Sequence, residues 1–208
     1  MVIAVDGPAA SGKGTIARAL ATHFGLPHMD TGLLYRGVAL TLWRWGGDPG
    51  NPFEAVRACS EMGITPDDPE LRSEAVSRIA SAISAYPAVR AALLDRQQAF
   101  AWRAEGAVLD GRDIGTVIAP DADVKLYVTA SAEVRAKRRL GELAERGMPA
   151  HFDEVLADLK SRDARDSGRG AAPLFRADDA ILLDTSDLTR DQAIAAAIRL
   201  AEEKLERV

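Results

Sequence analysis

The feature that most constrains this chain is a glycine-rich stretch near its N-terminus, which reads Gly7-Pro8-Ala9-Ala10-Ser11-Gly12-Lys13-Gly14-Thr15. Residues 1–6 before it form a short apolar run rich in β-branched residues, which favours a buried parallel strand. After it, Ile16, Leu20 and Phe24 recur at helical spacing, and Gly25 is typical of a helix end. The order of strand, loop and helix therefore predicts an α/β fold with the loop at the end of a strand.

This loop has the chemistry of a phosphate-binding site. Its glycines allow a tight turn in which backbone N–H groups converge on an anion, and the following helix adds the positive end of its dipole. Lys13 can reach the β- and γ-phosphates of a nucleotide. We therefore expect all nine residues from Gly7 to Thr15 to bind ATP. Gly14 stands where the general pattern has Ser or Thr, and this variant is similar to the loop of nucleoside monophosphate kinases.

The rest of the chain alternates strands with helices. Its 208 residues are 47% hydrophobic, enough for a sizeable core in a single domain over residues 1–208. Further strands are predicted near residues 107–109, 124–128 and 180–184. Helices are predicted over residues 33–45, 53–62, 70–104 with a break at Pro87, two basic segments after 128, and 189–206. This alternation predicts a doubly wound parallel sheet flanked by helices.

Charge and cysteine content exclude several classes of protein. The net charge is −5 and 5% of the residues are aromatic, which argues against nucleic acid as a partner. Residues 135–176 nonetheless hold ten Lys and Arg against seven Asp and Glu, which suits a small anionic ligand; a solvated helical face is the alternative. Cys59 is the only cysteine, no apolar run approaches the about 20 residues of a membrane span, and no secretory signal is present. We therefore expect a cytoplasmic protein without a membrane partner.

Four further motifs narrow the prediction. They are Asp30-Thr31-Gly32-Leu33-Leu34-Tyr35-Arg36, Tyr86-Pro87-Ala88-Val89-Arg90, Asp110-Gly111-Arg112-Asp113-Ile114-Gly115-Thr116 and Arg162-Asp163-Ala164-Arg165-Asp166-Ser167-Gly168-Arg169. Together with the phosphate loop, their order and spacing strongly resemble bacterial cytidylate kinase over nearly the whole chain. The resemblance implies a P-loop NTPase-type fold with a small acceptor-binding insert at about residues 37–105 and a helical lid at about residues 138–165. It also implies a monomer that transfers the γ-phosphoryl group of ATP to CMP or dCMP, with Mg²⁺ bound alongside ATP.

By this resemblance, Arg36 and Arg112 contact the acceptor phosphate. The planar guanidinium fork can bind a phosphate through two hydrogen bonds, which suits arginine to that role. Asp166, with Arg169, would bind the ribose, because a carboxylate accepts hydrogen bonds from hydroxyl groups. Taken alone, Arg36 could instead be a solvated helix arginine.

Arg90, Asp113 and Thr31 are implied to read the edge of the cytosine base. The amino group of cytosine donates to a carboxylate, whereas uracil presents an acceptor at that position and would leave Asp113 unpaired. Thr31 could instead be only the N-cap of the helix that continues from Leu33. The resemblance thus predicts discrimination between CMP and UMP at a single carboxylate.

The basic helices are interpreted as a lid over the phosphates. Two sets of residues each share one helical face by their spacing, namely Arg135, Arg138 and Arg139 in the first helix and Arg162, Asp166 and Arg169 in the second. Both faces are expected to converge on the phosphates and to exclude water, with residues 147–149 as the tip of the lid. The expected catalytic residues are therefore Lys13, Arg112, Arg138 and Arg162. Ordinary surface charge is the alternative for each lid arginine.

No direct metal ligand is predicted, and Mg²⁺ is expected to arrive with ATP. Thr15 or Asp110 would contact it, the latter through water, although Asp110 could equally be structural. His23, His28 and His151 are scattered along the chain without partners at ligand spacing, so none is predicted to be catalytic or metal-binding.

The chain departs from the resemblance at one place. Residues 62–71 offer a short connection where typical bacterial cytidylate kinases carry a longer insert with several β-strands, so a wall of the acceptor site is shortened. Two other functions remain open at this point. One is another small P-loop kinase, acting on UMP or on a non-nucleotide alcohol. The other is a regulatory protein that binds ATP without transferring phosphate.

Overall fold

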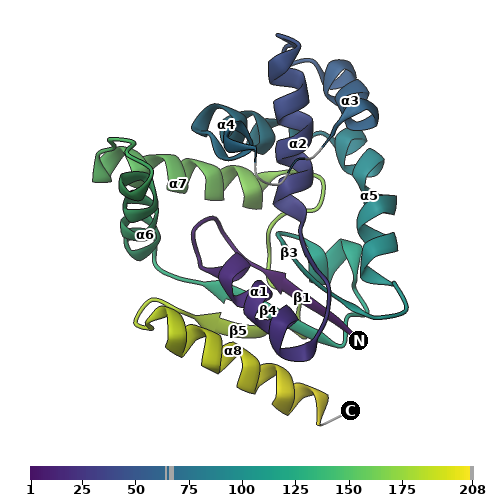
Figure 1. Ribbon diagram of the computed structural model, residues 1–208, viewed down its shortest axis with the longest axis vertical. Helices are drawn as coiled ribbons and strands as arrows, with labels where there is room; N and C mark the ends of the chain where they lie inside the picture. The colour runs from purple at the N-terminus through teal and green to yellow at the C-terminus, as the bar shows by residue number, and fades with distance from the viewer. Residues whose placement is uncertain (64, 66–67, 207–208) are drawn as a thin grey trace.

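A five-stranded sheet in which every pair of neighbouring strands is parallel forms the base of the molecule (Figure 1). The computed structural model describes residues 1–63, 65 and 68–206. The strand order is β2-β3-β1-β4-β5. The strands are β1 (Val2–Asp6), β2 (His28–Asp30), β3 (Ala107–Gly111), β4 (Val124–Thr129) and β5 (Ile181–Asp184). The doubly wound parallel sheet predicted from the sequence is confirmed.

The helices and helical turns lie between the strands in the chain. They are α1 (Lys13–Phe24), α2 (Thr31–Arg44), α3 (Pro52–Glu61), η1 (Pro69–Arg72), α4 (Glu74–Ile83), α5 (Pro87–Ala101), η2 (Ile114–Ile118), α6 (Ala132–Glu145), α7 (Phe152–Gly168) and α8 (Arg190–Leu205). No helix in the described part of the chain is long and apolar enough to span a membrane.

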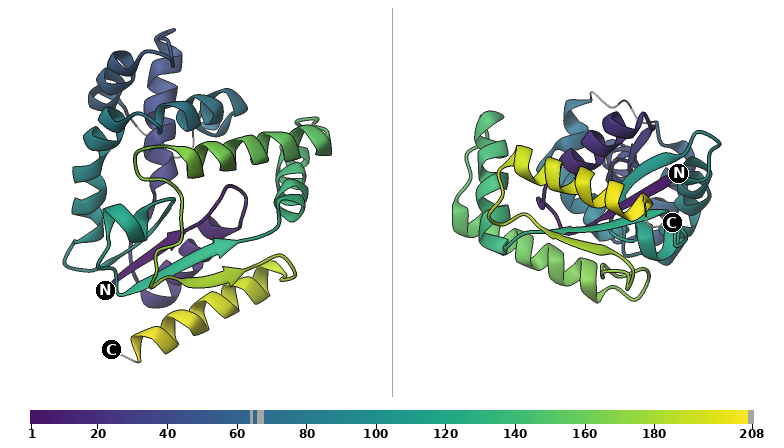
Figure 2. Two further views of the ribbon diagram at one scale, coloured as in Figure 1. Left: turned by 180° about the vertical axis from the view of Figure 1, so that it is seen from behind. Right: turned by 90° about the horizontal axis from the view of Figure 1, so that it is seen from below.

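The alternation of side chains along β1 explains the layers. Ile3 and Val5 pack with α1 and α8 on one face of the sheet, whereas Val2 and Ala4 pack with η2 and the end of α5 on the other. Successive side chains of a strand point to opposite faces, so a strand covered on both sides must be apolar throughout. Figure 2 shows α8 lying along the sheet in both further views.

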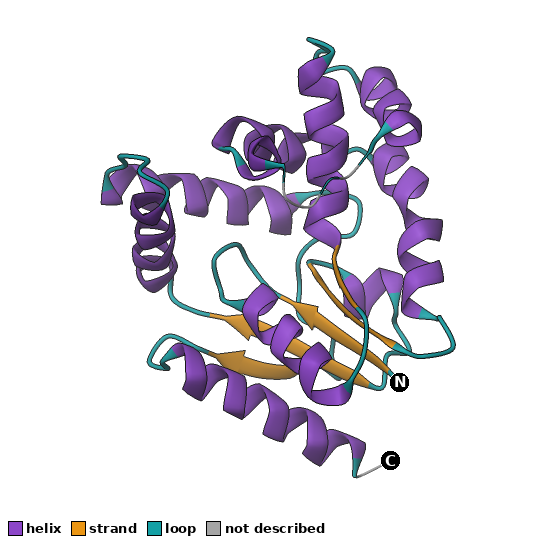
Figure 3. Ribbon diagram, in the orientation of Figure 1, coloured by secondary structure: helices purple, strands orange, loops and turns teal. Residues whose placement is uncertain are grey.

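A second core lies in the helices that rise above the sheet. Helices α2, α3, α4 and α5 bury a cluster that includes Leu42, Leu71, Ile83 and Leu93. Helices α6 and α7 pack on each other and on the phosphate loop through Ala9, Leu143 and Leu159. In Figure 3 the loop after β1 rises from the arrowhead of that strand into the space below α7. The carboxyl ends of the strands therefore face the phosphate loop, helices α2 to α5, and helices α6 and α7.

Several element boundaries differ from the prediction. Strand β2 was not predicted, because His-Met-Asp is short and its residues are only partly buried; it forms by pairing with β3 through Met29 and Leu109. Helix α2 begins at Thr31 rather than at residue 33, directly after that strand. The turn η2 was also missed.

The predicted helix over residues 70–104 is three elements. The expected break falls at Pro87, which begins α5, and Ser73 ends η1 and caps α4 by accepting from the Val76 N–H. The connection at residues 62–71, interpreted above as a shortened wall, includes the first three residues of η1. Residues 64, 66 and 67 of it lie outside the described residues.

Leu126, at the centre of β4, is 1% exposed and tests the sheet core. Leu126→Ala is expected to lower the free energy of unfolding by about 2–5 kcal/mol, because it removes buried methyl groups and leaves a cavity. Leu182 in the neighbouring strand is 49% exposed, so Leu182→Ala is the matched control and should cost less than about 1 kcal/mol. Urea unfolding of both variants makes the comparison. Equal losses in the two variants would contradict this account of the core.

Candidate functional site

The backbone of the phosphate loop is unusually turned. Gly7, Ala10 and Gly12 have positive φ angles of 154°, 59° and 90°. A side chain at Gly7 would collide with the Val128 carbonyl group of β4, so only glycine lets the loop leave the sheet at this point. These conformations form a concave turn between β1 and α1, as the sequence predicted.

Two loop carbonyls are held on the outer side of the turn. Arg135 Nη1 donates to the Ala9 carbonyl oxygen at 3.3 Å, and Arg138 Nη1 donates to that of Ser11, also at 3.3 Å. The Thr185 hydroxyl lies 3.1 Å from the same Ser11 oxygen. Because a trans peptide is planar, the N–H of the next residue points the opposite way from each carbonyl. The N–H groups of Ala10 and Gly12 therefore point away from the two arginines of α6.

Lys13 begins α1 inside this turn. Burial, together with repulsion by Arg112 and Arg162, lowers the pKa of Lys13 to about 8, although Asp110 and Asp30 act in the opposite direction. Among the described residues no hydrogen bond or salt bridge to its ammonium group is present. A bound anion would raise this pKa again, since an opposite charge nearby favours the protonated form.

Asp6, at the end of β1, connects the loop with the motif after β3. Its two carboxylate oxygens accept from the backbone N–H groups of Ile114 and Gly115 at 2.9 and 2.8 Å. Burial raises the pKa of Asp6 to about 6, although these two hydrogen bonds oppose the rise. The contact fixes the start of η2, and with it the chain that carries Arg112 and Asp113.

Asp110 and Thr31 join the ends of β2 and β3. His28 Nε2 lies 2.8 Å from Asp110 Oδ1, and the Thr31 hydroxyl donates to the Asp110 carbonyl at 2.8 Å. The structure therefore gives His28 a carboxylate partner that its sequence position did not indicate. Asp30 occupies the N-cap position of α2, so the interpretation of Thr31 as the N-cap is wrong: Thr31 is already helical and its hydroxyl faces β3.

A charged group lies between α7 and the end of β3. It consists of Arg112, which follows β3, and of Asp166 and Arg162 of α7. Arg112 Nε donates to Asp166 Oδ2 at 2.8 Å, and Arg162 Nε lies 4.0 Å from the same oxygen without a hydrogen bond. Burial works against the Arg112 charge, yet the pKa of Arg112 is raised because Asp166 more than offsets it. Burial and repulsion by Arg112 lower the pKa of Arg162 to about 10. Two guanidinium groups thus share one carboxylate, an arrangement that attracts a further anion.

Arg90, Asp113 and Arg169 form a second charged group. Arg90 Nη2 donates to Asp113 Oδ2, and Arg169 Nη2 lies 3.7 Å from Asp113 Oδ1. The Arg90 guanidinium also lies over the Tyr35 ring, 5.7 Å from its centroid. The residues expected to read the base are therefore brought together, except that the Thr31 hydroxyl proton is directed to β3.

Arg36, expected at the acceptor phosphate, points to α4 in this structure. Its Nη1 donates to the Ser77 hydroxyl at 2.7 Å and to the Leu71 carbonyl at 3.3 Å. Ser81, one turn further along α4, accepts from Arg165 of α7 at 2.5 Å. Ser77 and Ser81 were not predicted from the sequence. Their i, i+4 spacing on α4, which puts both on one face, is the signal that could have indicated them.

The arginines of α6 contact three different neighbours in this structure, and their convergence on the phosphates stays a prediction. Arg135 forms a bidentate pair with Asp163 of α7 at 3.1 and 2.6 Å, and Arg138 Nη1 donates to the Thr185 hydroxyl at 2.9 Å. Arg139 pairs with Glu74 of α4. Residues at i, i+3 and i+4 share a broad face, but long side chains from it reach three different neighbours.

A comparison with known protein families decides between the candidate functions. The family model described as "Cytidylate kinase" matches residues 3–203. This chain belongs to the cytidylate kinase family. The match includes all five motifs on which the resemblance rests.

Curated relatives agree over nearly the full length. The chain is 54% identical to "Cytidylate kinase" of Methylocella silvestris over 97% of this chain and 94% of that protein. It is 56% identical to "Cytidylate kinase" of Xanthobacter autotrophicus over 97% of both, and 55% identical to "Cytidylate kinase" of Granulibacter bethesdensis over 98% of both. Such complete matches leave no room for a long extra insert in these cytidylate kinases, so the short connection at residues 62–71 is not peculiar to this chain.

Solved structures support the fold. A protein from Eubacterium ventriosum described as uncharacterized matches with a TM-score of 0.56 at 15% identity, over 98% of each chain. A gluconokinase from Sinorhizobium meliloti matches with a TM-score of 0.51 at 16% identity, over 99% of this chain and 94% of that one.

The buried Asp6 makes stability depend on pH. Its pKa is about 6 in the folded protein against 3.8 as the ordinary value, so the folded state holds this proton more tightly. Asp6 therefore favours the folded state less and less as pH rises from about 4 to about 6, by about 3 kcal/mol in total. Urea unfolding of the wild type and of Asp6→Asn across this range measures the difference between them. Parallel pH profiles would contradict the assignment.

Proposed function

We propose that this kinase holds ATP in the loop of residues 7–15 and CMP or dCMP among the charged groups between α2, α5 and α7, with direct transfer of the γ-phosphoryl group between them. It is an ATP-dependent cytidylate kinase that forms ADP with CDP or dCDP. The observation that carries the site assignment is that Arg112 and Arg162, which share the Asp166 carboxylate, lie close enough to Lys13 at the start of α1 to lower its pKa by repulsion. Donor and acceptor phosphates placed in the two halves would meet at these three cations.

Transfer needs positioning and charge stabilisation rather than a side-chain base. The acceptor phosphate oxygen is already anionic, so no proton has to be removed before it attacks. Arg112 and Arg36 would orient that phosphate, and Lys13, Arg162 and Arg138 would stabilise the charge that spreads over the transferred group. Release of Arg36 from Ser77 would accompany acceptor binding, because the hydroxyl is a weaker partner than a phosphate dianion.

Base and ribose recognition follow from the second charged group. Asp113 is 4% exposed and faces two arginines, and its carboxylate retains lone pairs for the amino group of cytosine. Arg90 would donate to the base acceptors, and Thr31 would contribute a lone pair. Asp166 and Arg169 would bind the ribose hydroxyls. These roles predict preference for cytosine over uracil.

The residues next to the loop fit a magnesium ion that arrives with ATP. Asp110 is 2% exposed, and its Oδ2 lies on the side of Gly14, 3.5 Å from where a Cβ at that glycine would be. No cluster of three or more potential metal ligands is present in the described residues, which suits an ion held by one carboxylate or hydroxyl, phosphate and water. Asp110 or Thr15 would contact its shell. The ion, when bound, neutralises part of the phosphate charge.

The regions that close the site are proposed from their contacts. Residues 138–165 would act as the lid, and residues 37–105 as the acceptor-binding part of a single domain. Helix α4 contacts both lid helices, through Glu74 with Arg139 and through Ser81 with Arg165. We further propose a cytoplasmic monomer that needs neither nucleic acid nor a membrane.

A coupled assay of ADP release tests the function and separates it from the alternatives. With ATP and Mg²⁺, turnover is expected with CMP and dCMP at a kcat/KM about 100-fold or more above that with UMP, AMP or GMP. Preference for UMP would overturn the roles of Asp113 and Arg90. ATP binding without turnover on any of these acceptors would favour the regulatory protein.

The proposed role of Lys13 concerns the ATP phosphates and not the binding of CMP. Lys13→Met should lower kcat by about 100-fold or more, since it removes a charge that acts on the transferred group, while Kd for CMP changes by less than about threefold. Steady-state kinetics and calorimetric titration with CMP provide the two numbers. Arg199, whose side chain is 68% exposed on α8, offers a control in Arg199→Met. An equal loss of turnover and of CMP affinity would contradict the assignment of Lys13 to the transferred phosphoryl group.

A further inference from the structure

The buried Asp110 carboxylate at the end of β3 has one oxygen bonded and the other directed to the phosphate loop. Its Oδ1 lies 2.8 Å from His28 Nε2, whereas its Oδ2 lies 3.5 Å from where a Cβ at Gly14 would be. The Asp110 side chain is 3% exposed and the His28 side chain 17%. Among the described residues no hydrogen bond to Oδ2 is present. One oxygen is thus held from β2, and the other is available on the side of the loop.

The register of the sheet brings His28 to this carboxylate. His28 of β2 pairs with Val108 of β3, which stands two residues before Asp110. Side chains two residues apart along a strand point to the same face, and Val108 packs in the core cluster that α1 covers. His28 and Asp110 therefore lie on the face of the sheet that carries the helix after the phosphate loop, and two paired strands set the distance between them.

His28 fixes the side chain of Asp110, whereas Thr31 fixes its backbone. The Thr31 hydroxyl donates to the Asp110 carbonyl oxygen at 2.8 Å. An ionised carboxylate can only accept hydrogen bonds, so His28 Nε2 is the donor in the contact with Oδ1. With the backbone held and Oδ1 bonded, the carboxylate has one orientation.

We propose that His28 is a positioning residue for Asp110, an inference that rests on the proposed function. By holding Oδ1, His28 keeps Oδ2 directed to the loop, where Asp110 is proposed to contact the water shell of the magnesium ion that arrives with ATP. Removal of a group that orients a carboxylate at a metal site typically changes metal affinity or activity about 10–100-fold. His28 itself contacts neither the nucleotide nor the ion.

Binding of ATP with and without Mg²⁺ tests the proposal. Calorimetric titration in the absence of an acceptor gives Kd for ATP in MgCl₂ and in EDTA, and the ratio of the two is the gain in affinity that Mg²⁺ provides. His28→Leu should reduce this gain about 10-fold and leave Kd in EDTA within about twofold of the wild type. His28→Gln should restore most of the gain, because a glutamine amide can donate from nearly the position of Nε2.

His23→Leu is the matched control. His23 forms a similar pair with Glu202, 2.9 Å apart, but on the surface, where both side chains are exposed. This variant should therefore keep the full gain. When Asp110→Asn is already present, His28→Leu should cause little further loss, because both changes act on the same contact.

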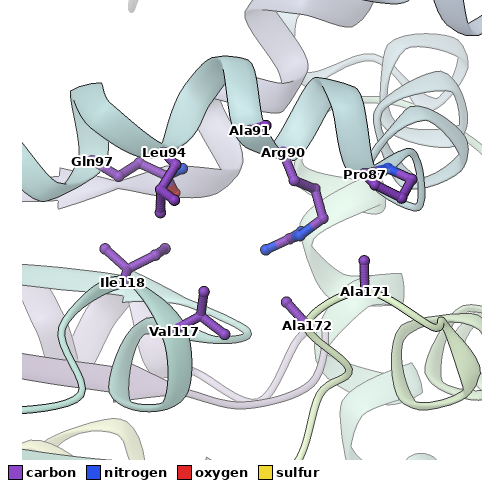
Figure 4. Close-up of a pocket in the computed structure, with 9 residues that line it drawn as sticks. All are labelled: Pro87, Arg90, Ala91, Leu94, Gln97, Val117, Ile118, Ala171 and Ala172. Atoms are coloured by element: carbon purple, nitrogen blue, oxygen red, sulfur yellow. The ribbon is translucent and has the colours of Figure 1, made fainter.

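The acceptor site should not respond to the loss of His28. Arg90, which is proposed to read the base, lies in the wall of a cavity of about 280 Å³ (Figure 4). The residues that line this cavity belong to α5, η2 and residues 171–172, and none of them belongs to β2. KM for CMP is therefore expected to stay within about twofold of the wild type in His28→Leu.

The outcomes separate this proposal from the proposed function. A wild type without turnover on CMP overturns the function on which the proposal rests. A wild type that turns over CMP but binds ATP equally well in MgCl₂ and in EDTA overturns the contact of Asp110, and the role of His28 with it. A full gain in His28→Leu overturns the role of His28 alone.

A merely structural role would give a different result. Equal losses of ATP affinity in MgCl₂ and in EDTA, together with a lower melting temperature, would indicate such a role and overturn the proposal. If His28→Leu does not fold, His28→Asn decides the matter, because its amide is too short to reach Asp110. The gain should then fall in His28→Asn and persist in His28→Gln, and equal gains in the two variants would overturn the proposal.

Discussion

One buried carboxylate holds the two halves of the site in register. Asp6 ends the central strand β1, next to the phosphate loop, and accepts both N–H groups at the start of η2. Gly111 of β3, directly before Arg112 and Asp113, and Tyr127 of β4 lie beside Asp6 on its two sides. Without this contact the loop and the arginine motif would be joined only through the sheet. Burying this carboxylate costs free energy, because burial disfavours its charged form, and the raised pKa of Asp6 reflects that cost.

The candidate site buries several positively charged side chains close together, although they repel one another. Burial lowers the pKa values of Lys13, Arg36, Arg162 and Arg169, and repulsion by neighbouring cations adds to the effect. Carboxylates offset only part of this, because Asp166 and Asp113 each face two arginines. Phosphate groups would complete the charge balance, so binding and charge neutralisation are the same event. Such interactions weaken with salt at exposed positions and much less in a buried cleft.

The sequence allowed much of the fold to be predicted, whereas the roles of the site residues stay a prediction. The glycine pattern around Lys13 predicted the loop, and apolar runs predicted four of the five strands, because both are local signals. Strand β2 and the turn η2 depend on pairing with β3 and on Asp6, which the local sequence does not contain. Helical spacing predicted which arginines share a face, but side-chain direction depends on neighbours such as Glu74 and Ser77.

Helix α6 holds the phosphate loop from outside through Arg135 and Arg138, and Arg135 also joins α6 to α7 through Asp163. The start of α6 is therefore tied both to the phosphate loop and to α7. An exchange of lids between related kinases would preserve the loop conformation only if Arg135, Arg138 and Asp163 were exchanged together.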